Sequence, residues 1–225
     1  MSARIPLLAT LALGAALLGA AKAPYEISAA KGLPEGPSKE VAALLQSEGH
    51  QVSGPKGVYC TVWLAKSVDV KPTFKPSLNL KYPLTNGQLI GLLQVADKAE
   101  FTDFRKQPIK PGVYTLRYAK QPEDGNHIGT SEVYDFLVAI PAKDDADPKM
   151  IGTFTTLAKM SAKASGTSHP AIISLLPVEK PAAKAALEHD EEKDFWILNA
   201  TTGGKADKTD VPMSLRLVVV GASEG

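Results

Sequence analysis

Apolar and polar residues alternate with a period of two along most of the chain, which is the period of a β-strand. Turn-forming Pro, Gly, Asn and Asp residues separate the alternating segments. This pattern is typical of a sandwich or barrel. We therefore predict a mainly β fold, an antiparallel β-sandwich (Ig-like or jelly-roll-like) with one or two short helices. The expected strands cover residues 59–64, 78–82, 89–95, 113–119, 133–140, 171–176, 195–199 and 213–220.

The clearest of these strands, 113–119, follows a turn with a physical rationale. Pro111 fixes φ, and Gly112 accepts the positive φ that a type II turn requires. Strand geometry then separates the next residues into two faces. One face is expected to carry Tyr114, Leu116 and Tyr118, and the other Thr115, Arg117 and Ala119.

Two segments have helical rather than strand spacing. Ser38 is a good N-cap for a short helix that ends near Gly49, with Val41, Leu44 and Leu45 on its buried face. A second helix is expected from Asp147-Pro148 to Gly166, because Asp is a good N-cap and proline is favoured in the first turn. The Lys-, Ala- and Glu-rich stretch 181–193 is expected to be a loop or a short helix.

The N-terminus has the three-part layout of a secretory signal peptide. Arg4 precedes an apolar run from Ile5 to Leu18, and small residues follow it. We predict a signal peptide over 1–21 and cleavage after Ala21; cleavage after Ala23 would leave Pro24 next to the cut. An uncleaved anchor is the alternative. Residues 22–37 are then expected to be a flexible leader, and residues 38–225 a single β-sandwich domain. We expect the protein to be exported, to the periplasm or out of the cell, without stable membrane insertion after signal cleavage.

Charge and cysteine content exclude several classes of protein. The chain has 25 basic and 24 acidic side chains, and Arg4 leaves with the signal peptide, so the mature protein is close to neutral. Few arginines and scattered lysines do not form the basic stripe of a nucleic-acid binder, so no nucleic-acid partner is expected. The lone Cys60 cannot form an internal disulfide and is predicted to be a small buried hydrophobe.

Five blocks of the sequence are similar to an uncharacterised family of exported proteins from acidobacteria and planctomycetes. They are YCTVWL (59–64), IKPGVYTLRY (109–118), QPEDGNHIGT (121–130), DFLVAIPA (135–142) and ASGTSHPA (164–171). The resemblance spans most of the mature chain. It implies a bacterial, exported origin, but no activity, because no function is established for that family.

The histidines offer the most interesting polar positions, although none lies in a metal-ligand pair. His127 lies in a glycine-bearing polar loop, and His169 directly precedes another expected strand. These residues can shape turns, form a ligand surface, or build a metal or acid/base centre if the two loops converge. The tentative ligand-binding set is Asp124, Asn126, His127, Thr130, Asp135 and His169.

Other chemistry has weaker support in the sequence. There is no Gly-x-Ser-x-Gly elbow, and the acidic run around His189 is expected to be a solvated face. Strand aromatics are expected mainly in the core, with a sugar-stacking row as the alternative; they are Tyr59, Trp63, Tyr114, Tyr118, Tyr134 and Trp196.

From these observations we predict an exported, non-catalytic binding or envelope-associated module without a cofactor. Its partner is expected to be a small molecule, a glycan or an envelope protein. The alternative is a metal-dependent enzyme built on the loops around His127 and His169.

Overall fold

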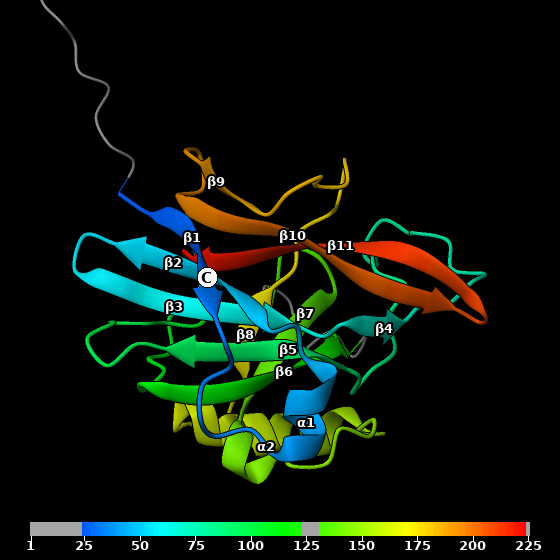
Figure 1. Ribbon diagram of the computed structural model, residues 1–225, viewed down its shortest axis with the longest axis horizontal. Helices are drawn as coiled ribbons and strands as arrows, with labels where there is room; N and C mark the ends of the chain where they lie inside the picture. The colour runs from blue at the N-terminus through cyan, green and yellow to red at the C-terminus, as the bar shows by residue number, and fades with distance from the viewer. Residues whose placement is uncertain (1–23, 123–130, 224–225) are drawn as a thin grey trace, which may run out of the picture.

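The computed structural model describes residues 24–122 and 131–223. Strands dominate, as the sequence predicts, and they form two sheets that are antiparallel apart from one short parallel pairing. The first sheet has seven strands in the order β1-β2-β3-β5-β6-β7-β8 (Figure 1). Their bounds are β1 Glu26–Lys31, β2 Glu48–Gly54, β3 Gly57–Leu64, β5 Leu89–Val95, β6 Gly112–Lys120, β7 Asp135–Pro141 and β8 Ala171–Ser174.

The second sheet is built around a long hairpin of β10 (Phe195–Ala206) and β11 (Thr209–Val220). The free edge of β10 pairs with two short strands in turn. Antiparallel β9 (Ala186–Asp190) covers its first half, and parallel β4 (Ser67–Asp69) covers its second half. Both sheets are also joined at one edge, because Leu175 just beyond β8 forms a bridge with Leu217 of β11.

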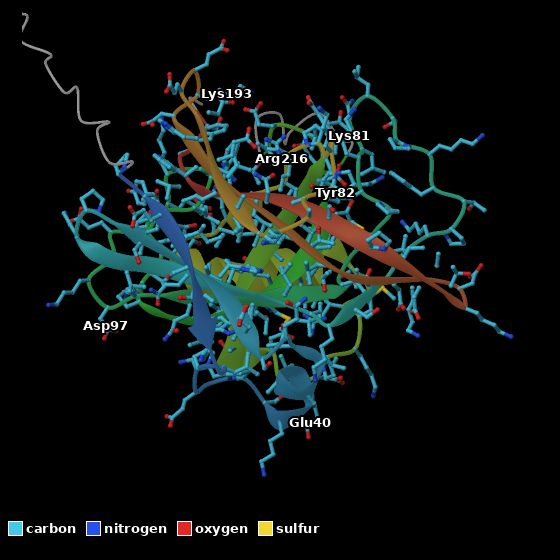
Figure 2. The ribbon with its side chains drawn as sticks, turned by 45° about the horizontal axis from the view of Figure 1, so that its top comes forward. Glu40, Lys81, Tyr82, Asp97, Lys193 and Arg216 are labelled. Carbon is cyan, nitrogen blue, oxygen red and sulfur yellow. The ribbon has the colours of Figure 1, made fainter. Side chains whose placement is uncertain are left out.

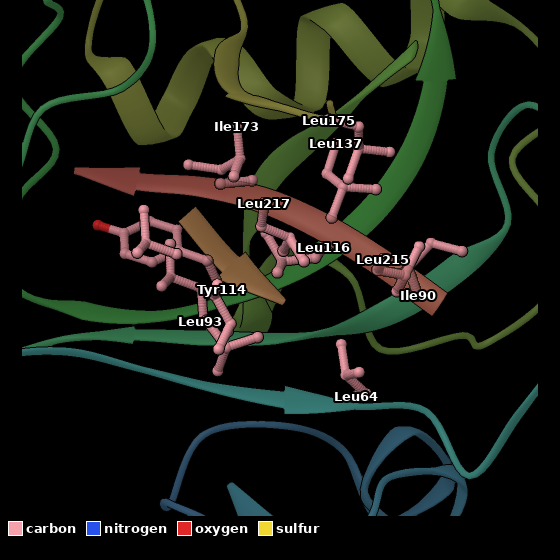
Figure 3. Packing of buried hydrophobic residues seen from close by; sticks show 14 of the residues in the cluster. Leu64, Ile90, Leu93, Tyr114, Leu116, Leu137, Ile173, Leu175, Leu215 and Leu217 are labelled. Carbon is pink, nitrogen blue, oxygen red and sulfur yellow. The ribbon is translucent and has the colours of Figure 1, made fainter. Parts of the chain in front are cut away.

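The main core lies between the two sheets (Figure 3). Leu116 and Tyr114 of β6 point into it from one side, and Leu215 and Leu217 of β11 from the other. Cys60 of β3 belongs to this core and is completely buried, which confirms the interpretation of this residue as a small hydrophobe. Burial raises the pKa of its thiol to about 12.

Two α-helices and a short 3₁₀ helix complete the described part of the fold. Helix α1 (Lys39–Leu44) begins at the expected cap, where the Ser38 hydroxyl accepts a hydrogen bond from the Val41 amide. Helix α2 (Phe154–Ser165) packs on β7 on the side away from the main core, with Leu157 buried (Figure 1). The 3₁₀ helix η1 (Ala142–Asp144) directly follows β7.

Several boundaries differ from the sequence predictions. Helix α1 ends before Gly49, which lies in β2 beneath the Trp63 indole, and Leu44 is 47% exposed rather than buried. Helix α2 begins at Phe154 with Thr153 as its cap. The backbone carbonyl of Asp147, the cap expected from sequence, instead accepts a hydrogen bond from a buried arginine described below.

Three predictions about regular structure are wrong. Residues 78–82 form no strand, because the Lys81 and Tyr82 amides donate to a side-chain carboxylate instead of a neighbouring strand. The expected flexible leader 22–37 contains β1, which pairs along its whole length with β2. Within 181–193, residues Ala186–Asp190 are a strand rather than a loop or helix, because β10 offers them a free edge.

The predicted signal peptide lies outside the described residues. Within the part of the chain that the structure describes, no helix is long and apolar enough to cross a bilayer.

Candidate functional site

The structure places two of the six residues in the predicted ligand set. Asp124, Asn126, His127 and Thr130 lie outside the described residues. Asp135 opens β7, and His169 lies in the loop between α2 and β8.

Asp135 is a buried structural anchor. Its carboxylate accepts hydrogen bonds from the Lys81 amide (2.6 Å), the Tyr82 amide (3.2 Å) and the Tyr118 hydroxyl (2.6 Å). Burial raises the pKa of the Asp135 carboxyl, and these three hydrogen bonds oppose that change. The Tyr82 hydroxyl in turn donates to the Leu176 carbonyl at 2.7 Å. The carboxylate thus holds the irregular 81–82 segment on the sheet.

His169 is exposed and lies at the opposite end of the β7–β8 strand pair from Asp135. Phe136 pairs with Ser174 and Ala139 with Ala171, so Asp135 is beside the end of β8 while His169 precedes its start. The His169 carbonyl accepts a hydrogen bond from the Ser165 hydroxyl at 2.6 Å, which fixes the loop through its backbone. The structure therefore does not bring these two residues together.

No group of three or more metal-ligating side chains occurs within residues 24–122 and 131–223. Because His127 is outside these ranges, the metal-dependent alternative stays a prediction.

A buried ion pair that the sequence analysis missed lies on the outer face of β6. Arg117 is fully buried, and its guanidinium donates to both carboxylate oxygens of Asp145 at 2.6 and 2.8 Å. Its other N–H groups donate to the carbonyls of Gly87 (2.8 Å), Lys149 (2.8 Å) and Asp147 (2.6 Å). All five N–H donors of the guanidinium have partners within the chain.

Asp103 is a third buried anchor, in the loop between β5 and β6. It accepts hydrogen bonds from the amides of Arg105 (2.9 Å), Gln107 (2.8 Å) and Ile172 (2.9 Å). The Gln107 side chain also donates to it at 2.8 Å, and burial raises the pKa of the Asp103 carboxyl. This carboxylate joins its loop to the first amides of β8.

A surface hollow with a volume of about 200 Å³ lies beside the turn between β2 and β3. Pro55 and Lys56 make the turn, and Gly57 completes it with a φ of 106°, a value that side-chain-bearing residues rarely adopt. The facing wall is the loop 98–100 that follows β5. We call this hollow the turn pocket, lined by Tyr25, Gly54, Pro55, Lys56, Gly57, Val58, Tyr59, Lys98, Ala99 and Glu100.

Aromatic rings form one side of the turn pocket. Tyr25 lies directly over Gly54, where even a methyl group would approach its ring to 2.6 Å. The Tyr25 ring meets Tyr59 edge-on with centroids 5.6 Å apart, and it contacts Trp196 of the other sheet at 5.3 Å. Tyr59 also contacts Phe101 at 5.1 Å. The pocket therefore has a rigid aromatic side anchored in both sheets.

The rim of the turn pocket is charged and exposed to solvent. Lys56 and Glu100 form an ion pair at 2.9 Å, and the hydrogen bond from Lys56 lowers the pKa of the Glu100 carboxyl. Lys98 is exposed and, within the described part of the chain, forms no ion pair. The two ammonium groups and one carboxylate leave the rim with one net positive charge.

The six strand aromatics are divided between the core and the surface. Trp63, Tyr114, Tyr118 and Trp196 are buried, and the Trp196 indole is stacked with the His189 ring at 4.2 Å. Tyr59 and Tyr134 are only partly buried, and Tyr59 reaches the turn pocket. The Gly-Pro-Lys-Gly turn at 54–57 is visible in the sequence. Its contact with Tyr25 is not, because the sequence places Tyr25 in the expected leader.

Comparison of the chain with known protein families, with curated proteins and with solved structures finds no match. The resemblance to an exported bacterial family stays a prediction.

Proposed function

We propose that the protein is an exported, non-catalytic binding module whose turn pocket holds a ring-shaped, negatively charged group of a small molecule or glycan. Export rests on the N-terminal pattern of Arg4, the apolar run and the small residues before Lys22. The observation that carries the binding role is the combination of the Tyr25 and Tyr59 rings with Lys98 at the rim, a lysine that forms no ion pair with any other described residue.

The size of the pocket limits what it can hold. Pockets for whole drug-sized ligands usually measure about 300–1,000 Å³, whereas the turn pocket measures about 200 Å³. It therefore fits a single six-membered ring, either as a small acid or as the end of a longer chain. Aromatic side chains bind such rings through their faces and edges, and Lys98 provides the charge that favours a carboxylate.

The use of the ionisable groups supports binding rather than catalysis. The buried charged side chains that the structure describes are held by hydrogen bonds within the chain itself, and each joins a loop to the sheet. They are Asp103, Arg117, Asp135 and Asp145. The charged groups of the turn pocket, Lys56, Lys98 and Glu100, are exposed to solvent, whereas acid–base catalysts are commonly desolvated by their surroundings.

Calorimetric or NMR titration of the protein tests this proposal with four probes. Glucuronate and benzoate both carry a carboxylate on a six-membered ring; glucose and benzyl alcohol are their uncharged counterparts. We expect an acid to bind more tightly than its uncharged counterpart, and the preferred acid shows whether the natural ligand is a sugar or an aromatic acid. Failure of both acids to bind would reject the proposal.

Variants locate the binding in the turn pocket. Lys98→Gln is expected to weaken acid binding about two- to fivefold, the scale of an exposed charge pair. Tyr59→Leu is expected to weaken it about two- to tenfold through the lost ring contact. Lys39→Gln, an exposed lysine on α1 that does not line the pocket, is the matched control. Equal affinities in Lys98→Gln, Tyr59→Leu and the control would place the binding elsewhere.

A further inference from the structure

The segment between β4 and β5 forms a long loop with an unusual surface. From Val70 to Gln88 it contains three lysines, Lys71, Lys75 and Lys81, and no Asp or Glu. It contains no helix or strand, and it lies at the periphery of the molecule beside β4 and the β10–β11 hairpin (Figure 1). Its charge sets it apart from a chain that is otherwise close to neutral.

A tight turn in this loop presents a leucine to solvent. The Ser77 amide donates to the Leu80 carbonyl at 2.8 Å, and the Leu80 amide donates to the Ser77 hydroxyl at 3.0 Å. The Lys81 ammonium donates to the Ser77 carbonyl at 2.8 Å and so closes the turn from outside. Leu78, at the tip, is 86% exposed and is the most exposed large hydrophobic side chain among the described residues.

The base of the loop is fixed to the body of the protein. Tyr82 and Leu84 are buried in the main core, and Asp135 holds the Lys81 and Tyr82 amides. The Tyr134 amide donates to the Asn79 carbonyl at 2.7 Å, one residue beyond Leu78. Figure 2 shows Lys81 and Tyr82 close together where the loop joins the body. The loop thus presents Leu78 from a defined position.

We propose that this loop, which we call the Leu78 loop, docks the domain peripherally on an anionic lipid bilayer. Leu78 enters the boundary between headgroups and acyl chains, and Lys71 and Lys75 lie among the lipid phosphates. A basic surface with an apolar side chain at its tip has the two components that interfacial membrane binding uses. A soluble polyanion would attract the lysines but would offer nothing apolar to Leu78. The proposal is independent of the ligand in the turn pocket.

A polarity-sensitive fluorophore at position 78 tests this docking in the full chain. Leu78→Cys introduces a reactive exposed thiol, while the native Cys60 is buried and its raised thiol pKa keeps it protonated. Leu44→Cys, at the half-exposed leucine of α1, is the matched control. The label reports the environment of one residue, so binding of any other segment to the vesicles does not imitate the result.

With vesicles of phosphatidylglycerol and phosphatidylcholine in equal parts, we expect a blue shift and quenching by a lipid-borne quencher at position 78 but not at position 44. The shift should disappear with pure phosphatidylcholine and at about 500 mM salt, where charges are screened within a few ångströms. Lys71→Gln with Lys75→Gln should raise the lipid concentration for half-maximal shift about fivefold per lysine. Lys39→Gln with Lys159→Gln should leave it unchanged.

Other results would overturn the proposal. A label at position 78 that stays in water with anionic vesicles excludes docking through this loop. Equal shifts at positions 78 and 44 indicate non-specific adsorption. A response to heparin without a response to vesicles identifies a soluble polyanion as the partner instead of a lipid surface.

Discussion

Two buried charges hold loops to opposite faces of β6 and its neighbour β7, and they do so in different ways. Arg117 faces away from the main core and meets a carboxylate of opposite charge, Asp145, besides three backbone carbonyls. Asp135 receives only uncharged donors, from Tyr118 and the Lys81 and Tyr82 amides. The first site is electrically balanced by a direct ion pair, whereas the second is a buried carboxylate held mainly by dipoles, with a smaller contribution from the charge of Lys81.

The two anchors also hold loops with different exposure. Arg117 fixes the 145–149 segment and, through the Gly87 carbonyl, the end of the Leu78 loop that leads into β5. Asp135 fixes the base of the Leu78 loop, whose tip faces solvent. Loss of the first anchor should therefore affect the stability of the whole fold, whereas loss of the second should mainly free one surface loop.

The largest effect is expected from breaking the balanced pair. Arg117→Met leaves the buried Asp145 carboxylate without its counter-charge, which typically costs about 3–5 kcal/mol of unfolding free energy. Arg117→Lys should also destabilise, because an ammonium cannot make the paired contacts of the guanidinium. Urea unfolding measures both. A loss below about 1 kcal/mol, the scale of an exposed ion pair, would contradict this reading.

A double variant separates charge from hydrogen bonding at the same site. Arg117→Met with Asp145→Leu removes both charges, which often restores stability at buried pairs. Here we expect only partial recovery, because the carbonyls of Gly87, Asp147 and Lys149 lose their donor as well. Full recovery in urea unfolding would show that the three carbonyl contacts contribute little.

Asp135→Asn is expected to have a smaller effect, about 1–3 kcal/mol, because a neutral amide replaces an anion that accepts several hydrogen bonds. Hydrogen exchange should accelerate at the Lys81 and Tyr82 amides, which donate to this carboxylate. Asp69→Asn, at an exposed carboxylate in β4, is the control. A loss as large as that of Arg117→Met would remove the distinction between the two anchors.

Tyr118→Phe removes one donor from Asp135 and should cost about 1–2 kcal/mol, within the range for hydrogen bonds to charged groups. Tyr114→Phe is a matched control on the same strand and face, since its hydroxyl donates to the uncharged Lys110 carbonyl at 2.7 Å. We expect the Tyr118 variant to be the less stable of the two in urea. The opposite order would argue against an ionised Asp135.

The pH dependence of stability follows from the raised pKa of Asp135. Between the ordinary aspartate value of about 3.9 and this higher folded-state value, the folded protein binds the proton more tightly than the unfolded chain does. The stabilisation that this group gives is therefore fully present below its pKa in the unfolded chain, and it is lost as pH rises through its pKa in the folded protein. The wild type should gain stability relative to Asp135→Asn as pH falls through this window; a constant difference would contradict the shift.

We expect Asp135→Asn to have no effect on the rate at which a thiol reagent labels Cys60 in the folded protein. The thiol is completely buried in the main core on β3, and its pKa of about 12 keeps it protonated. A thiol reagent should label it only after unfolding, in the wild type and in the variant alike. Rapid labelling of folded Asp135→Asn would show that the anchor supports the whole core.

Part of the candidate chemistry could be predicted from the sequence, and part could not. The turn before β3 is visible as Gly-Pro-Lys-Gly, but the turn pocket also needs Tyr25, which reaches it only because β1 joins the sheet. Asp135 stands out as a polar residue beside an apolar strand, yet its partners Lys81 and Tyr82 are more than fifty positions away. The local sequence does not distinguish a carboxylate that anchors a loop from one that binds a ligand.

The sequence by itself determined the local features of this protein: the alternation of β6, the Ser38 cap of α1 and the burial of Cys60. These depend on the nearest residues along the chain, through strand pleating, backbone capping and side-chain polarity. Only the tertiary structure decided which irregular segments find partners. β9 is a strand because β10 has a free edge, and Arg117 is buried because five acceptors from distant loops surround it. Such long-range pairings carry a cost in chain entropy, and short-range sequence patterns do not show which of them form.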